Sequence, residues 1–214
     1  LHTCGVTDAG VGYCWGHGGT KKLGIADNTS STNTPGLVSG SITWKTITGG
    51  KNSTCGIDTD GDAHCWGSKA NGQLGEGSTS GDSYLPLPVS GGLTFSSING
   101  GGFDNYCAIT TDDDLYCWGE GNGYSMGDGD TSDNTSPGFV MANAHSVVAG
   151  GGRDNAGNFY GTYSCAIKNN GSAFCWGETV TGGGEHMGVG YNYGNNHPRY
   201  PTMVLSGEKW LKNM

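Results

Sequence analysis

The sequence predicts an all-β fold built from about four repeats of a four-stranded antiparallel sheet. Among its 214 residues are 43 glycines, and only 14% of the chain is charged, a composition typical neither of a helical bundle nor of a highly charged disordered segment. A pair of cysteines ten positions apart occurs four times. The first cysteines of these pairs follow one another at spacings of 51, 52 and 58 residues, which indicates an internal repeat.

Each cysteine pair encloses a predicted β-hairpin. If Cys55 lies opposite Cys65, residues 59–61 remain as a three-residue loop. The last residue of such a loop normally adopts the left-handed backbone conformation, which Gly61 tolerates without steric cost. The corresponding residues of the other units also tolerate this conformation; they are Gly10, Asp113 and Gly171.

Directly opposed cysteines in an antiparallel pair have Cα atoms about 4.5 to 5.5 Å apart, a separation that a disulfide accepts. Zinc binding is the alternative, but zinc-binding cysteine pairs usually lie only two to four residues apart. We therefore expect the disulfides Cys4–Cys14, Cys55–Cys65, Cys107–Cys117 and Cys165–Cys175. Four disulfides indicate an oxidising compartment, so we expect a secreted or extracellular protein.

The repeat extends beyond the cysteines. Each Cys-Trp-Gly is followed by Leu-Gly or Met-Gly, then by prolines and a valine, a short apolar strand such as 42–44 or 93–95, and a Gly-Gly. Each unit thus offers about four strands, as a blade of a β-propeller requires. We predict one repeat domain, 1–214, with units at about 1–40, 41–91, 92–144 and 145–203.

Residues 204–214 form a further half-unit that complements the N-terminal strand, because the segment around Trp210 matches the one around Trp44. Three architectures agree with these ends: a partial propeller cut from a larger one, an open arc joined head to tail, and a small closed ring. The missing initiator Met and the start inside a strand indicate a processed form or an excerpt.

The segment Asn71-Gly72-Gln73-Leu74-Gly75, which follows Cys65-Trp66-Gly67, carries a family resemblance. It resembles the repeat of the regulator of chromosome condensation family, and weaker copies of the pattern run along nearly the whole chain. The resemblance implies a β-propeller, which in that family has seven blades. The family includes nuclear nucleotide-exchange factors that bind chromatin, light-receptor and ubiquitin-ligase domains, and secreted inhibitors of bacterial enzymes, so the fold alone does not select a function.

The repeated tryptophans are expected to fill space between strands or adjacent blades, because Trp15, Trp66, Trp118 and Trp176 occupy the same place in every unit. The glycine runs 100–102 and 150–152 lack the Lys-Ser/Thr of a phosphate-binding loop, so we read them as tight turns.

Charge and composition restrict the function. The net charge of −9 argues against nucleic acid or an anionic membrane surface as a partner, and no apolar run approaches the length that spans a bilayer. No Ser-His-Asp, Cys-His or paired-carboxylate set can be assembled, so we expect no catalysis and no cofactor. The sequence favours an extracellular structural or binding scaffold. The alternative is a secreted propeller that regulates or inhibits an enzyme, or a nucleotide-exchange regulator.

Binding residues are sought where the repeat is interrupted, at the insertion 151–163 and the loop 191–200. Both are rich in residues that make adaptable contacts to proteins and sugars. We expect a protein partner, a like subunit in a homo-polymer, or a glycan there; a surface loop that only covers an apolar edge is the alternative. The candidate residues are Arg153, Phe159, Tyr160, Tyr163, Tyr191, Tyr193, Arg199 and Tyr200.

Two further kinds of site are weaker. Asp128, Asp130 and Asp133 form a calcium candidate, although the glycine and distal glutamate of a helix-loop-helix site are missing. Asn-x-Ser/Thr sequons, which are glycosylation acceptors in a eukaryotic secretory pathway, begin at Asn28, Asn52, Asn134 and Asn170.

Overall fold

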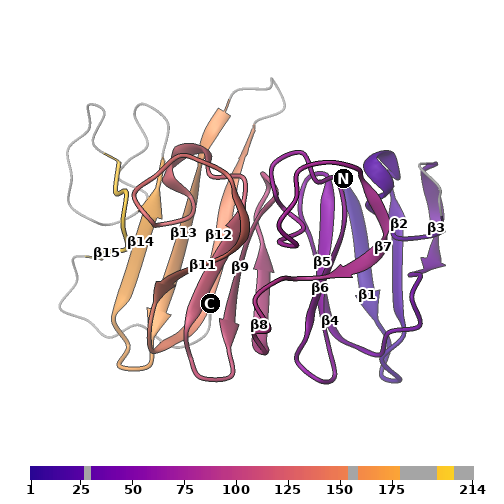
Figure 1. The fold of residues 1–214 in the computed structure, drawn as a ribbon, viewed down its shortest axis with the longest axis horizontal. Coiled ribbons are helices and arrows are strands. Elements are labelled where there is room, and N and C mark those ends of the chain that lie inside the picture. The colour runs from indigo at the N-terminus through magenta and orange to yellow at the C-terminus, as the bar shows by residue number, and fades with distance from the viewer. Residues whose placement is uncertain (27–29, 154–158, 179–196, 205–214) are drawn as a thin grey trace.

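The structure, a computed structural model, describes residues 1–26, 30–153, 159–178 and 197–204. These residues form four antiparallel sheets that stand side by side along the molecule (Figure 1). The described part of the chain contains no α-helix, only two short 3-10 turns, η1 (Gly19–Lys21) and η2 (Asn122–Tyr124). The all-β prediction and the propeller-type blades are confirmed.

We call the sheets blades 1 to 4, in chain order. Blade 1 contains β1 (His2–Val6), β2 (Gly12–Gly16) and β3 (Thr32–Leu37). Blade 2 contains β4 (Trp44–Gly49), β5 (Ser53–Asp58), β6 (Ala63–Gly67) and β7 (Ser83–Pro88). Blade 3 contains β8 (Phe95–Gly100), β9 (Asn105–Thr110), β10 (Leu115–Gly119) and β11 (Asn134–Met141). Blade 4 contains β12 (Ala144–Arg153), β13 (Phe159–Lys168), β14 (Ala173–Gly177) and β15 (Thr202–Met203).

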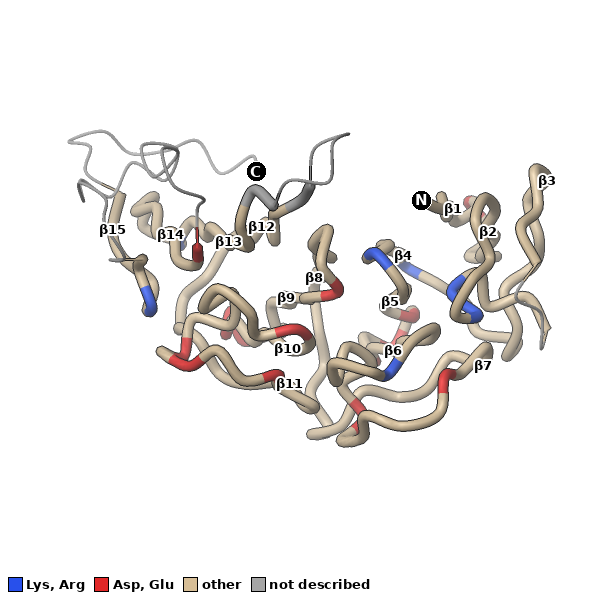
Figure 2. Tube along the Cα trace, turned by 90° about the horizontal axis from the view of Figure 1, so that it is seen from above, with Lys and Arg blue, Asp and Glu red and all other residues tan. Residues whose placement is uncertain are grey.

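In the described part of the chain the four blades form an open arc rather than a closed ring (Figure 2). The first strands of blades 2 to 4, β4, β8 and β12, lie along its concave side, and β3, β7 and β11 lie outside. Apolar side chains fill the space between neighbouring blades: Leu23 and Val38 of blade 1 belong to one buried cluster with Trp44 and Trp66 of blade 2. The buried apolar side chains therefore pack between consecutive blades.

Blade 1 has three strands among the described residues, which agrees with the predicted incomplete first unit, because no strand lies where β4 lies in blade 2. One detail of the strand assignment differs from the sequence prediction. The expected strands 42–44 and 93–95 begin only at Trp44 and Phe95. The preceding residues cross from one blade to the next, where the Thr43 carbonyl accepts a hydrogen bond from the Thr59 N–H at 3.0 Å.

The cysteine hairpins have the predicted register. Cys55 pairs with Cys65 and Ile57 with Ala63, and the Asp58 N–H donates to the Asp62 carbonyl at 3.0 Å. Hydrogen-bonded and non-hydrogen-bonded residue pairs alternate along an antiparallel hairpin. Because Asp58 and Asp62 form a hydrogen-bonded pair, Cys55 and Cys65 form a non-hydrogen-bonded pair, in which the Cα atoms lie closer together. The four expected disulfides are present, each with a Cα–Cα distance of 4.1 Å.

The predicted left-handed loop residues are also confirmed. The φ angles are +77° at Gly10, +93° at Gly61, +65° at Asp113 and +85° at Gly171. The Asp58 carboxylate stabilises its own loop by accepting hydrogen bonds from the N–H groups of Asp60 and Asp62, at 3.0 and 2.9 Å. The aspartates of this hairpin therefore stabilise the turn.

Candidate interaction surfaces

Consecutive blades are joined by a contact that centres on the repeated tryptophan. The indole N–H of Trp66 donates to the Lys22 carbonyl at 3.0 Å, and that of Trp176 donates to the Ser125 carbonyl at 2.9 Å. Each acceptor comes two residues before a glycine with positive φ, Gly24 or Gly127. A Cβ on Gly24 would lie only 2.6 Å from the Trp66 indole nitrogen, so the absence of a side chain allows the close approach.

A second hydrogen bond recurs at every described blade contact. We call β4, β8 and β12, which lie along the concave side, the inner strands. The first residue of each inner strand donates its N–H to the carbonyl of the last loop residue in the hairpin of the preceding blade. The pairs are Trp44 to Gly10, Phe95 to Gly61 and Ala144 to Asp113, each at 2.8 Å. Because both hydrogen bonds involve backbone atoms of the preceding blade, the geometry repeats although the side chains differ.

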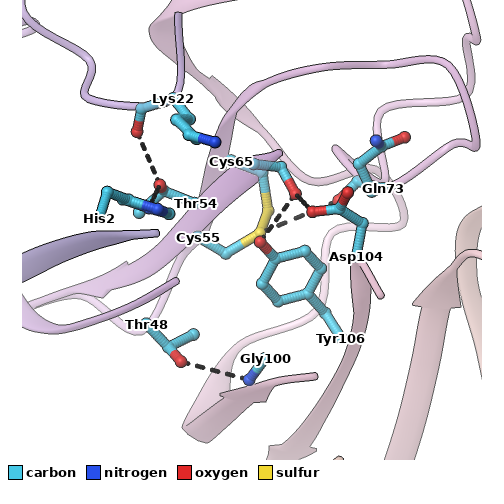
Figure 3. The surroundings of a disulfide bond; sticks show 11 residues. His2, Lys22, Thr48, Thr54, Cys55, Cys65, Gln73, Gly100, Asp104 and Tyr106 are labelled. Atoms are coloured by element: carbon cyan, nitrogen blue, oxygen red, sulfur yellow. Dashed lines mark hydrogen bonds between the residues drawn. A yellow bond between two sulfur atoms is a disulfide. The ribbon is translucent and has the colours of Figure 1, made fainter. Parts of the chain in front are cut away.

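The contact between blades 2 and 3 is a variant. Tyr106 occupies the place of Thr54 and Ser164, and its hydroxyl lies 2.8 Å from the Ser53 hydroxyl, which donates to the Asp104 carboxylate at 2.7 Å (Figure 3). Burial raises the pKa of Tyr106 well above its ordinary value, so the hydroxyl stays protonated and donates to Ser53. Among the described residues the buried Trp118 indole N–H has no hydrogen-bond partner.

The contact between blades 1 and 2 holds a buried polar row. The His2 imidazole lies 2.7 Å from the Thr54 hydroxyl, which donates to the Lys22 carbonyl at 2.7 Å (Figure 3). Burial, followed by the nearby Lys22 charge, lowers the pKa of His2 to about 4. The Lys22 ammonium donates to the Lys51 carbonyl at 2.9 Å; burial lowers its pKa, and the Asp104 carboxylate partly offsets this.

Blade 1 has a described neighbouring blade on one side only, where blade 2 lies. Trp66, Trp118 and Trp176 are 0% exposed, whereas Trp15 remains half-buried. One edge of β1 pairs with β2, and the other edge pairs with no described strand. We call this region, made of the free edge of β1 together with Tyr13 and Trp15, the blade 1 face. The sequence had indicated the incomplete first unit, and it had placed Trp15 among the tryptophans expected to fill space between strands or adjacent blades.

The insertion of the fourth unit lengthens one hairpin. β12 and β13 contain ten residues each, whereas β4, β5, β8 and β9 contain six, and the hairpin rises above the other blades (Figure 1). Arg153 pairs with Phe159 near its end, and Tyr160 follows in β13. Tyr163 packs against the Cys165–Cys175 disulfide, which indicates a packing role. Tyr191 and Tyr193 lie outside the described residues.

Arg199 and Tyr200 are brought to a separate surface. The Arg199 guanidinium lies 4.9 Å from the centre of the Tyr124 ring, and the Arg199 carbonyl accepts a hydrogen bond from the Gly129 N–H at 3.1 Å. Tyr200 is 61% exposed and covers Gly129 with its hydroxyl end. The binding candidates therefore do not form one described cluster, and they stay predictions.

The three calcium-candidate aspartates are used by the local backbone. Asp128 accepts from the Asp130 N–H at 3.0 Å, Asp130 from the Ser132 N–H at 3.0 Å, and Asp133 from the Gly121 N–H at 3.0 Å. No group of three histidine, cysteine or acidic side chains that could hold a metal ion occurs within the described ranges.

The sequons differ in accessibility. Asn170 is exposed at a hairpin tip and accepts a hydrogen bond from the Ser172 N–H at 3.0 Å. Asn52 and Asn134 are half-buried, and the Asn134 amide donates to Asp128 at 3.0 Å. Asn28 lies outside the described residues. No described helix is long and apolar enough to cross a bilayer.

Comparison with known proteins supports the resemblance seen in the sequence. No protein-family model matches the chain. The ultraviolet-B receptor UVR8 of Arabidopsis thaliana is 33% identical over 141 residues, which cover 64% of this chain and 31% of the receptor. The human regulator of chromosome condensation is 29% identical over 123 residues, 58% of this chain and 28% of that protein. Homologues of this chain are regulator of chromosome condensation repeat proteins.

The structural similarity agrees. The crystal structure of yeast RCC1 (Prp20) bound to Kap60 superimposes with a TM-score of 0.73 at 21% identity, over 96% of this chain and 47% of the yeast chain. This likeness shows the fold. The chain spans about a third of each of these two curated relatives and about half of the solved propeller. The named relatives are a receptor and a regulator, so this repeat family supports a binding or regulatory role.

Proposed function

We propose that the protein is a non-enzymatic extracellular scaffold that binds proteins, including further copies of itself, through the surfaces of its propeller blades. The observation that carries this proposal is the set of four disulfide-bonded blades, in which the same backbone hydrogen bond joins each blade to the next. Head-to-tail contact between copies that does not close produces a filament.

The disulfides support an oxidising location. By the chain-entropy model each short loop contributes about 2 to 3 kcal/mol to stability, so the reduced chain loses a large share of the free energy of unfolding. Peptide mapping of the natural protein without reduction is expected to recover the four local pairs. Free thiols in the natural protein would contradict the extracellular assignment.

Self-association is tested with the chain itself as the probe. Sedimentation velocity over a dilution series is expected to show species larger than one chain that dissociate on dilution, and electron microscopy is expected to show linear assemblies. A single species of 22.0 kDa at every concentration would exclude the polymeric form of the scaffold.

Loop contacts form a second binding mode. Tyr200 is exposed, so Tyr200→Ala should weaken capture of a partner protein or glycan without lowering the melting temperature, whereas Tyr163→Ala should lower the melting temperature because Tyr163 packs on a disulfide. A glycan array and cross-linking to secreted proteins are the measurements. Equal melting losses for the two variants would assign Tyr200 to packing.

A regulatory role is the alternative, because yeast Prp20p binds Gsp1p and histones. All eight cysteines are paired here, which favours an extracellular target over a nuclear one. Accelerated release of fluorescent GDP from a small GTPase in the presence of the chain would support the exchange-regulator alternative over the scaffold.

A further inference from the structure

We propose that the contact between blades 3 and 4 binds ordered water, which bridges the side-chain amide of Asn105 in blade 3 to the Ser164 hydroxyl in blade 4. The site does not depend on the proposed scaffold function, because it concerns how two blades of one chain are joined. Comparison of the three described blade contacts, where the same two positions of the repeat meet, points to it.

The two positions come just before the first cysteine of each hairpin. The residue two places before that cysteine pairs with the glycine of Cys-Trp-Gly, and the residue directly before it pairs with the tryptophan. We call them the outgoing residue, which faces the following blade, and the incoming residue, which faces the preceding one. At the three contacts the outgoing residues are His2, Ser53 and Asn105, and the incoming residues are Thr54, Tyr106 and Ser164.

Two of the contacts are direct, because one long side chain meets one short side chain. The His2 imidazole lies 2.7 Å from the Thr54 hydroxyl, and the Tyr106 hydroxyl lies 2.8 Å from the Ser53 hydroxyl. The ring belongs to the outgoing residue in the first contact and to the incoming residue in the second. In both cases a ring spans the distance between the blades.

The contact between blades 3 and 4 brings together two short side chains. Asn105 and Ser164 are both 0% exposed, and neither the nitrogen nor the oxygen of the Asn105 amide has a hydrogen-bond partner among the described residues. The Ser164 hydroxyl lies 3.4 Å from the Ser125 carbonyl, which is long for a hydroxyl donor, usually about 2.7 to 2.8 Å from its acceptor. The buried Thr162 hydroxyl donates to the Asn122 carbonyl. Both blade 4 hydroxyls are therefore directed to carbonyls rather than to the Asn105 amide.

The glycine that follows each inner strand shows how far the next blade reaches. A Cβ on Gly50 would lie 2.6 Å from the Tyr106 hydroxyl and 2.7 Å from the Asp104 carboxylate, so blade 3 fills this place at its contact with blade 2. Gly101 occupies the same place in blade 3, and the three atoms nearest to a Cβ there all belong to Asn105. Within the described ranges, the side chains of blade 4 therefore do not take the place that Tyr106 and Asp104 take.

The chemistry of the site selects water as the ligand. The Asn105 amide offers N–H donors and a carbonyl acceptor, so its ligand has to accept and to donate hydrogen bonds. A metal ion would satisfy only the amide oxygen. The neighbouring Asp104 carboxylate is directed to blade 2, where it accepts from the Asn52 N–H and the Ser53 hydroxyl at 2.7 Å each. Water does both, and a buried water typically makes about three hydrogen bonds to polar groups that lack other partners.

The wild-type protein in solution provides the first test. With isotope-labelled protein, the side-chain amide protons of Asn105 should show nuclear Overhauser contacts to a water of long residence time. A high-resolution crystal structure should place an ordered water within hydrogen-bond distance of both the Asn105 amide and the Ser164 hydroxyl. The contact between Ser53 and Tyr106 is the internal control, and it should hold no bridging water.

Two substitutions test whether the water bridges the blades. Asn105→Gln adds one methylene, so its amide should reach Ser164 directly and the water contacts should disappear. Asn105→Leu has a similar size but cannot bind water, so it leaves the Ser164 side without its bridge and should lower the melting temperature by about 2 to 4 °C. Ser53→Ala, the control at the direct contact, should also lower the melting temperature but leave the water contacts of Asn105 unchanged. Circular dichroism and the four disulfides are checked for each variant.

Each outcome decides for or against the water site. A wild-type Asn105 amide that shows no water contact overturns the inference, whatever the variants do, so the test survives a variant that folds poorly. A higher melting temperature for Asn105→Leu also overturns it, because the amide would then be unpaired in the wild-type protein. Water contacts that persist in Asn105→Gln would place the water away from Ser164 and overturn the bridge between the blades.

Discussion

At the scale of single residues, the left-handed loop position of each hairpin has the clearest consequence. Gly61 has a φ of +93°, and its carbonyl accepts the inner strand of the next blade, so the loop must keep this shape. Gly61→Val should lower the free energy of unfolding by about 1 to 2 kcal/mol, because a β-branched residue is strained there. Gly61→Asn should cost less, since asparagine visits this region. Urea denaturation measures both, and equal losses would contradict the proposed turn.

The buried indoles provide a second comparison between residues. The Trp66 indole N–H donates to the Lys22 carbonyl, whereas the Trp118 indole N–H has no hydrogen-bond partner among the described residues. Phenylalanine at either position removes the same ring atoms. We expect Trp66→Phe to destabilise by about 1 kcal/mol more than Trp118→Phe, which is the net value of one hydrogen bond. Chemical denaturation of the two variants gives the difference, and a larger loss for Trp118→Phe would contradict the assigned geometry.

At the scale of elements, the close approach of a loop glycine to the next tryptophan joins one blade to another. A Cβ on Gly75 would lie 2.9 Å from two atoms of the Trp118 indole, whereas a Cβ on Gly77 would meet nothing within 4 Å. Both residues have positive φ, +67° and +95°. Gly77→Ala should therefore cost only the backbone strain, about 1 kcal/mol, and Gly75→Ala about 3 kcal/mol because overpacking is added. Thermal unfolding compares them, and similar losses would show that the indole moves aside freely.

The elements that were predictable from sequence are those specified locally. The spacing of Cys55 and Cys65 and the glycine at position 61 independently require the same hairpin, so its register, loop and disulfide follow without tertiary information. The start of β4 at Trp44 was not predictable, because it depends on where the chain crosses to the next blade. The Ser53, Asp104 and Tyr106 network was missed for a related reason: it joins two blades through residues about 50 positions apart.

At the scale of the whole molecule, the main contacts among the described blades join consecutive blades, so stability resembles that of a linear array in which the end units are least protected. The disulfides of the two end blades differ from those of the two central blades in their exposure to solvent. Cys55, Cys65, Cys107 and Cys117 are 0% exposed, while Cys4 and Cys165 are half-buried. The arc therefore combines two shielded central disulfides with two more accessible terminal ones.

This difference predicts an order of reduction in the folded protein. Under a mild thiol reductant at monomeric concentration, Cys4–Cys14 and Cys165–Cys175 should open before the two central disulfides, because attack requires access of the thiolate to a sulfur atom. Timed alkylation with mass spectrometry identifies each opened pair. Simultaneous opening of all four disulfides would show instead that reduction proceeds through global unfolding, and that the blades do not differ in local protection.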